Sequence, residues 1–164
     1  MQVRIAETQK TKMYNRQLLA LAGTMQAAEY VAGLTIKGFT YDSEKEQFSV
    51  DLLKELYSYN SMLDINGVLK KTSFEEIQKK MAYGLSWRGG SCDYDAEEYP
   101  EVRELVFWDI VQRAFEFPAN ECLEFLQTDG QCVFGGNDWI MWDYCFILLK
   151  KNMGIVLLCG AGPY

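Results

Sequence analysis

The stretch that decides the fold is Trp139-Ile-Met-Trp-Asp-Tyr-Cys-Phe-Ile-Leu-Leu149, followed by Lys150-Lys-Asn-Met-Gly154 and Ile155-Val-Leu-Leu-Cys159. Two apolar runs joined by a short polar link that contains glycine are typical of a β-hairpin. The runs are nearly continuous in apolar residues rather than alternating, which indicates that both faces of the hairpin are at least partly covered. We therefore expect a C-terminal β-hairpin at about 139–159.

The segments before the hairpin predict mainly helices. Apolar residues recur with a helical period over 13–32, 50–59 and 74–85, with Ser49 as an N-cap of the second segment and Thr72 or Ser73 of the third. The segment 101–115 is apolar on most faces and predicts the central buried helix. Shorter segments predict a helix at 118–126 and strands at 34–39 and 131–134. The sequence thus predicts an α+β fold in one domain, 1–164, with N-terminal helices packed on a small antiparallel sheet.

Composition narrows the class of protein. With 164 residues, of which 49% are hydrophobic and 24% charged, the chain has the make-up of an ordinary globular domain. No run approaches the roughly 20 apolar residues of a spanning helix, and the N-terminus lacks the apolar core of a signal peptide. We expect no membrane association and a cytoplasmic location. Five widely spaced cysteines fit a reducing compartment, with Cys122, Cys145 and Cys159 in the core.

The chain contains no histidine, which removes a large part of the catalytic repertoire. Ser-His-Asp and Cys-His catalysis, His-ligated zinc and the 2-His-1-carboxylate iron site are all excluded. No phosphate-binding loop, nucleophile elbow or dinucleotide fingerprint is present, and Cys92 lies beside acids that would raise the pKa of its thiol. We expect no enzymatic activity, no cofactor and no metal; a carboxylate-dependent enzyme without histidine is the less favoured alternative.

The negative charge is concentrated in the second half of the chain. Residues 1–82 carry a balance of +1, and residues 83–164 carry −8. Six acids fall between Cys92 and Glu104, interleaved with aromatic residues. Acidic surfaces steer basic partners, and Trp, Tyr and Arg often form the energetic centre of interfaces. The residues that we predict to bind a partner are Trp87, Arg88, Asp93, Tyr94, Asp95, Glu97, Glu98, Tyr99, Glu101 and Glu104, with Asp138 and Trp139 as a second acidic-aromatic pair.

The acidic run also fits two roles that involve no protein partner. The spacing Asp93-x-Asp95-x-Glu97, with Glu104 in the twelfth position, resembles the oxygen ligands of an EF-hand calcium loop. However, the sixth position, where that loop needs glycine, holds Glu98. Alternatively, the acids only solvate a loop and favour the N-terminus of the following helix through its dipole.

The general character of the chain, rather than any motif, resembles that of small cytosolic inhibitors. These include immunity proteins and antitoxins that neutralise a toxin or nuclease, and phage proteins that block a host defence nuclease. The resemblance implies a non-catalytic acidic protein that covers a basic protein partner, with Trp87, Tyr94 and Tyr99 as anchors. Direct nucleic-acid binding is not expected because the lysines form only scattered pairs, although a mimic of nucleic acid stays open. The alternative is an assembly subunit that associates through its C-terminal hairpin, and the sequence leaves the oligomeric state undecided.

Overall fold

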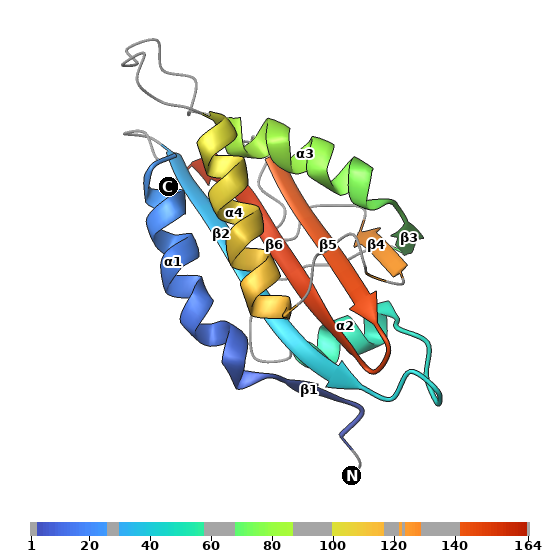
Figure 1. The fold of residues 1–164 in the computed structure, drawn as a ribbon. Coiled ribbons are helices and arrows are strands. Elements are labelled where there is room, and N and C mark those ends of the chain that lie inside the picture. The colour runs from blue at the N-terminus through green and yellow to red at the C-terminus, as the bar shows by residue number, and fades with distance from the viewer. Residues whose placement is uncertain are drawn as a thin grey trace.

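The centre of the fold is one antiparallel sheet with the strand order β1-β2-β6-β5-β4-β3 (Figure 1). The computed structural model describes residues 3–25, 30–57, 68–86, 100–116, 122, 124–128 and 142–163. The strands are β1 (Ile5–Glu7), β2 (Tyr30–Tyr41), β3 (Leu69–Lys71), β4 (Glu124–Thr128), β5 (Trp142–Lys150) and β6 (Met153–Pro163). The helices are the 3-10 turn η1 (Gln9–Thr11) and the α-helices α1 (Lys12–Gly23), α2 (Val50–Leu56), α3 (Phe74–Ser86) and α4 (Pro100–Phe115). The predicted α+β fold is confirmed.

The predicted C-terminal hairpin forms the middle of this sheet. Strands β5 and β6 pair from Trp142 with Ala161 to Lys150 with Met153, and a two-residue turn joins them. Asn152 in that turn has a φ of 64°, a left-handed conformation that asparagine tolerates better than most residues. Its side-chain oxygen accepts hydrogen bonds from the backbone N–H and the hydroxyl of Ser43, so the turn is fixed to the chain that follows β2.

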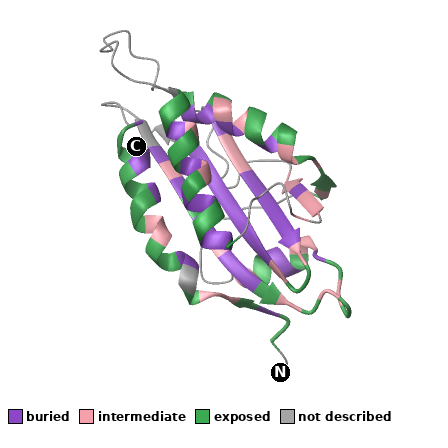
Figure 2. Cartoon of the chain, in the orientation of Figure 1, coloured by how far each residue is buried: buried purple, intermediate pink, exposed green. Residues whose placement is uncertain are grey.

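Both faces of the hairpin are covered, in agreement with its continuous apolar sequence. Helices α1, α3 and α4 lie over one face, and α2 lies behind the other (Figures 1 and 2). Alternate residues of β5 and β6 supply two separate cores, for example Phe146 and Leu157 under α4 and Ile147 and Val156 on the α2 side. Strands β2 and β4 also occupy both edges of the hairpin. The apolar residues of the hairpin are thus buried within the chain.

The helix predicted over 13–32 ends too late. Helix α1 stops at Gly23, and Tyr30 already begins β2, so the helical prediction is wrong for its last residues. In β2, Ala32, Leu34 and Ile36 all face the helices, which is a two-residue period. Alanines in this stretch fit both periods, and pairing of β2 along β6 decides in favour of the strand.

Helix α1 is fixed against the edge of β2 beyond the short strand β1. The side-chain amide of Asn15 donates to the carbonyl of Ile36 at 2.9 Å and accepts from its N–H at 2.8 Å, replacing a neighbouring strand. At the start of the helix, the buried hydroxyl of Thr11 accepts from the N–H of Gly38 at 3.0 Å. A Cβ at Gly38 would lie 2.7 Å from the methyl of Thr11, so the close contact requires glycine.

The remaining elements divide between confirmed and corrected predictions. Helices α2 and α3 begin where predicted, with Ser49 Oγ accepting from the third following N–H at 3.3 Å and Ser73 Oγ doing the same at 3.1 Å. The helix predicted at 118–126 is wrong from Glu124 onward, because 124–128 form β4, which pairs with β5 and β3. The predicted strand 131–134 lies outside the described residues. None of the helices that the structure describes combines the length and apolar character needed to cross a bilayer.

Candidate functional site

A buried arginine joins the ends of three helices, α1, α3 and α4. Arg103 of α4 is only 6% exposed. Its guanidinium donates to the carbonyl of Leu85 at 3.0 Å, to the carbonyl of Thr24 at 3.0 Å and to the Thr24 hydroxyl at 3.2 Å. The carbonyls at the C-terminal ends of α1 and α3 lack helical partners and carry partial negative charge, so a cation there is favourable.

This junction lies where α3 ends and α4 begins. Four of the six acids of the acidic run fall in the sequence between Ser86, the last residue of α3, and Pro100, the first of α4, and Arg103 ties α3 to α4 one turn after Pro100. Most of the predicted binding residues fall outside the described residues: Trp87, Arg88, Asp93, Tyr94, Asp95, Glu97, Glu98, Tyr99, Asp138 and Trp139. The candidate site is therefore built from the described residues that adjoin this run.

Two predicted acids, Glu101 and Glu104, lie in the first turns of α4. Glu101 is exposed and Glu104 is half-buried. Glu101 lies in the first helical turn, where the positive end of the helix dipole stabilises a carboxylate. Within the described residues, neither carboxylate forms an ion pair.

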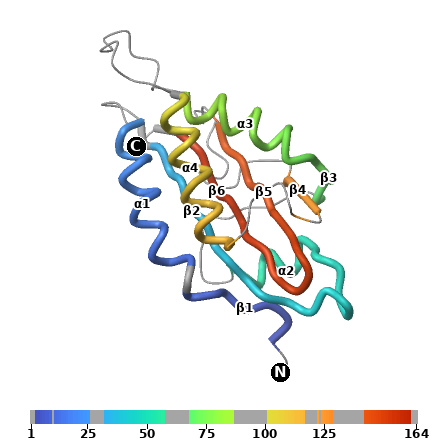
Figure 3. The backbone as a smooth tube through the Cα atoms, in the orientation of Figure 1, coloured from blue at the N-terminus to red at the C-terminus, as the bar shows by residue number. Residues whose placement is uncertain are grey.

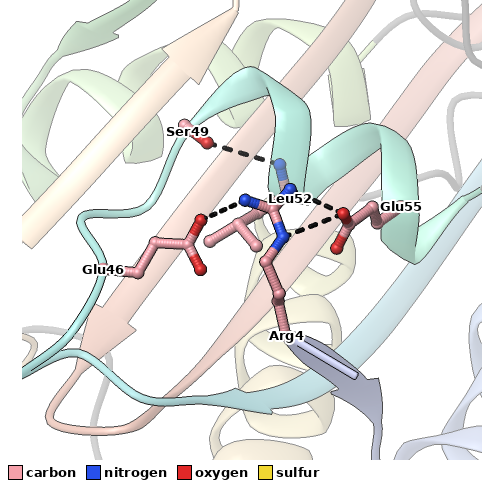
Figure 4. A network of polar contacts seen from close by, with 5 residues as sticks. All are labelled: Arg4, Glu46, Ser49, Leu52 and Glu55. Atoms are coloured by element: carbon pink, nitrogen blue, oxygen red, sulfur yellow. Dashed lines mark hydrogen bonds and ion pairs between the residues drawn. The ribbon is translucent and has the colours of Figure 1, made fainter. Parts of the chain in front are cut away.

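Some acids elsewhere in the described structure are engaged with cations. Arg4, just before β1, donates from Nε to Glu55 at 2.9 Å and also binds Glu46, tying the start of β1 to α2 and to the segment before it (Figure 4). On the turn after β2, Glu44 pairs with Lys151 at 3.3 Å. These carboxylates stabilise the packing of the chain. Asp51, Glu75, Glu76 and Glu124, like the pair at the start of α4, have no ion pair among the described residues.

The outer face of α4 is exposed and carries apolar residues in its N-terminal half, which corrects the prediction of a central buried helix. The helix covers the sheet with Phe107, Val111 and other core residues. On its opposite side Val102, Leu105 and Val106 are 53%, 72% and 40% exposed. The apolar residues on most faces of α4 thus serve two surfaces, one packed and one open (Figure 2). Contiguous exposed apolar side chains on a small protein often mark an interaction site.

The described cysteines lie in or against the core, and one surface hollow is lined in part by paired acids. Cys145 and Cys159 are buried, as predicted, and burial raises the pKa of the Cys159 thiol far above its ordinary range, which keeps it protonated. Cys122 is half-buried and packs against the core. A surface hollow of about 390 Å³ between the turn after β2 and the hairpin contains Glu44 and Glu46, both engaged in the ion pairs above. Among the described residues, no three acids or cysteines lie close enough to hold a metal ion.

Comparisons with known proteins give a likeness of fold. No protein-family model matches the chain, and no curated protein matches it either. Among solved structures, the crystal structure of citrus MAF1 is similar, with a TM-score of 0.55 over 91% of this chain and 99% of the other, at 8% sequence identity. The likeness is one of fold alone. At this identity it supports the α+β architecture and carries no residue of the candidate site.

The apolar pattern of α4 is consistent with its exposed outer surface, but the same pattern also fits a fully buried helix. Val102, Leu105 and Val106 add a second apolar stripe to a helix whose core stripe is already complete. The sequence cannot distinguish a helix buried on all sides from one with two apolar surfaces, because both have the same period. Acids in the first turn of the same helix, such as Glu101, favour the second case, because a carboxylate is costly to bury.

Proposed function

We propose that this protein is a non-catalytic binding protein that neutralises a basic protein partner, as immunity proteins, antitoxins and phage inhibitors of host nucleases do. The observation that carries the proposal is the N-terminal half of α4, where Glu101 and Glu104, without ion pairs in the described structure, adjoin the exposed Leu105 and Val106. Charges without an ion pair among the described residues, next to exposed apolar side chains, have the composition of a recognition surface.

Each kind of residue would have a separate role in this inhibitor. The acids of the run, together with Glu101 and Glu104, would attract the partner from a distance and accelerate encounter. Trp87, Tyr94 and Tyr99 would supply the desolvated contacts that slow dissociation. A protein that acts by covering a site needs no catalytic group of its own, and the lack of histidine agrees with this.

A fixed base for Glu101 and Glu104 favours inhibition over loose electrostatic attraction. Arg103 ties the start of α4, which carries both acids, to the ends of α1 and α3. A binding surface that is ordered in advance loses less entropy on association. We place this activity in the cytoplasm, where reduced thiols such as Cys145 and Cys159 persist.

The test is capture of the partner with matched baits. The wild-type protein and a variant with Asp93, Asp95, Glu101 and Glu104 replaced by Ser are immobilised, lysate from the native source is passed over both at low salt, and bound proteins are eluted with a salt gradient and identified by mass spectrometry. We expect a basic protein that the wild type releases at moderate salt and the variant fails to retain. Recovery of the same proteins on both baits, or of none on either, contradicts the proposal.

A further inference from the structure

The surface hollow of about 390 Å³ lies at the end of the sheet formed by the β5–β6 turn, opposite the start of α4 (Figure 3). Its walls are the chain that follows β2, the end of β5 with the turn after it, and the first residue of β4. Hydrogen bonds between Ser43 and Asn152 join the first two walls, and the ion pair of Glu44 with Lys151 at 3.3 Å does the same. The hollow is therefore formed in advance of any ligand, and its volume is that of a small-molecule site.

Aromatic and aliphatic side chains form the floor of this hollow. Phe48 and Leu149 are buried, and both belong to the core on the α2 side of the sheet. The half-buried ring of Tyr41 meets the ring of Phe48 edge-on, with 5.8 Å between their centroids. An aromatic ring attracts a cation over its face, and apolar side chains favour the carbon chain that carries the cation.

The acidic group of the hollow is Glu124, the first residue of β4. It pairs with Leu149 and precedes Leu126 by two residues, so its side chain lies on the face of the sheet that carries the floor. Glu124 is half-buried, whereas Glu75 and Glu76, which also lack ion pairs among the described residues, are exposed. A half-buried carboxylate gains more from a cation than an exposed carboxylate does, because water screens the attraction less.

The hydroxyl of Tyr41 lies near this carboxylate. Burial raises the pKa of the Tyr41 hydroxyl, and the negative charge of Glu124 raises it further. In the part of the chain that the structure describes, neither the hydroxyl nor the carboxylate forms a side-chain hydrogen bond. Two oxygen atoms that can accept a hydrogen bond therefore face one hollow, and both are available to a ligand N–H.

Three lysines also line the hollow, and each has a partner of its own. Lys45 and Lys151 pair with acids at 3.8 and 3.3 Å. The ammonium of Lys150 lies 5.3 Å from the ring centroid of Phe115, which belongs to the core on the other side of the sheet. The lysine charges are therefore balanced or directed away from the hollow, and the carboxylate of Glu124 sets its preference for a cation.

We propose that this hollow binds an organic ammonium ion, with the cation beside Glu124 and the Tyr41 hydroxyl and the alkyl chain over Phe48 and Leu149. The ammonium would donate one charge-assisted hydrogen bond to the carboxylate and a second hydrogen bond to the hydroxyl. A divalent metal suits the hollow less well, because it needs several oxygen ligands and no three acids of the described chain lie close enough.

Two sources carry this chemistry, a free alkylamine and the side chain of a lysine in another protein. In both, a primary ammonium ends a short alkyl chain. The inference does not depend on the proposed function, because none of the residues of the hollow is among the predicted partner-binding residues.

The test is an NMR titration of the full-length protein with butylammonium, which has the charge and the alkyl chain of a lysine side chain. Neutral butanol and anionic butyrate, of the same length, are the matched probes. We expect saturable shifts of the amide signals of Tyr41, Phe48 and Glu124, with a dissociation constant of about 1–10 mM for so few atoms. Butanol should bind at least about tenfold more weakly, and butyrate should cause no saturable shift.

Conservative substitutions assign the binding to the two oxygen atoms. Glu124→Gln removes the charge with little change of shape and should weaken butylammonium binding at least about tenfold. Tyr41→Phe keeps the ring, removes the hydroxyl and should weaken binding by about two- to tenfold. The matched control is Glu75→Gln, which removes the same charge from an exposed acid outside the hollow and should change the affinity by less than about twofold. Circular dichroism verifies that all variants are folded.

A lysine derivative with blocked backbone ends, acetyl-lysine-methylamide with a free side-chain amine, separates the two sources. Tighter binding of this probe than of butylammonium assigns the hollow to a lysine of another protein, and equal or weaker binding assigns it to a free amine. The inference fails if butylammonium causes no saturable shift, if butanol binds equally well, or if Glu124→Gln and Glu75→Gln bind butylammonium alike. The acid-to-Ser variant of the capture experiment should bind butylammonium as the wild type does, so failure of the proposed function and failure of the ammonium site are separate results.

Discussion

Replacing Arg103 by Met tests whether one buried cation holds the three helix ends together. Methionine keeps an unbranched apolar stem and removes the guanidinium, with its bonds of 3.0, 3.0 and 3.2 Å to Leu85 and Thr24. Hydrogen bonds from a charged donor each contribute about 1.5–3 kcal/mol to stability. Methionine also avoids the desolvation cost of burying a guanidinium, which offsets part of this loss. We therefore expect the unfolding free energy to fall by about 3 kcal/mol.

The assay is urea denaturation followed by circular dichroism, with Arg113→Met as the matched control. Arg113 lies on the same helix, its side chain is 66% exposed, and it pairs with Asp109 at 3.1 Å. An exposed pair of this kind contributes about 0.5 kcal/mol or less. If the two variants lose the same stability, or if Arg103→Met loses less than about 1 kcal/mol, the helix junction does not depend on the buried arginine and the reasoning is refuted.

Three further substitutions and one pH series test the packing. Gly84→Ala should lower unfolding free energy by about 1–3 kcal/mol, because its Cβ would lie 2.8 Å from the buried Trp142 ring. A Cβ at Gly23 would have nothing within 4 Å, so Gly23→Ala should raise the unfolding free energy by about 0.4–1 kcal/mol. Denaturation curves in which both variants shift the unfolding free energy in the same direction would contradict this account of the two helices. Leu105→Ser should change stability by less than about 0.5 kcal/mol, and a loss typical of a core residue would place the outer face of α4 in the interior. For Cys159, burial raises the pKa of the folded thiol, so both states are protonated below about pH 8.5 and only the unfolded state ionises above it. Stability should then fall with rising pH by about 1.4 kcal/mol per unit for this thiol, and stability curves that stay parallel for wild type and Cys159→Ala between about pH 8 and 10 would refute the assignment.

The sequence is most informative where local pattern and tertiary packing agree. The hairpin of β5 and β6 is recognisable because apolar residues on both faces of both strands have one ready structural explanation, a sheet covered on two sides. The serine caps of α2 and α3 are local interactions and are correctly predicted for the same reason. Strands β1 and β3, of three residues each, carry no such local pattern and exist only through pairing with β2 and β4.

Errors arise where a non-local contact decides between two compatible patterns. Residues 124–126 fit a short helix by composition, yet they pair with Leu149, Leu148 and Ile147 of β5. At the candidate site, the sequence predicts the acids of α4 but not Arg103 beneath them. A buried arginine cannot be recognised from sequence, because its partners are carbonyls at helix ends distant along the chain.

The most direct test of the central claim is the association rate between this protein and its purified basic partner as a function of ionic strength. Electrostatic steering predicts a rate constant that falls by at least about tenfold between low and physiological salt, because screening shortens the range of the attraction. The variant with Asp93, Asp95, Glu101 and Glu104 replaced by Ser should associate more slowly at low salt and show a flatter dependence. A rate constant that is independent of salt, or one with the same salt dependence in wild type and variant, would contradict the claim that these acids direct the protein to its partner.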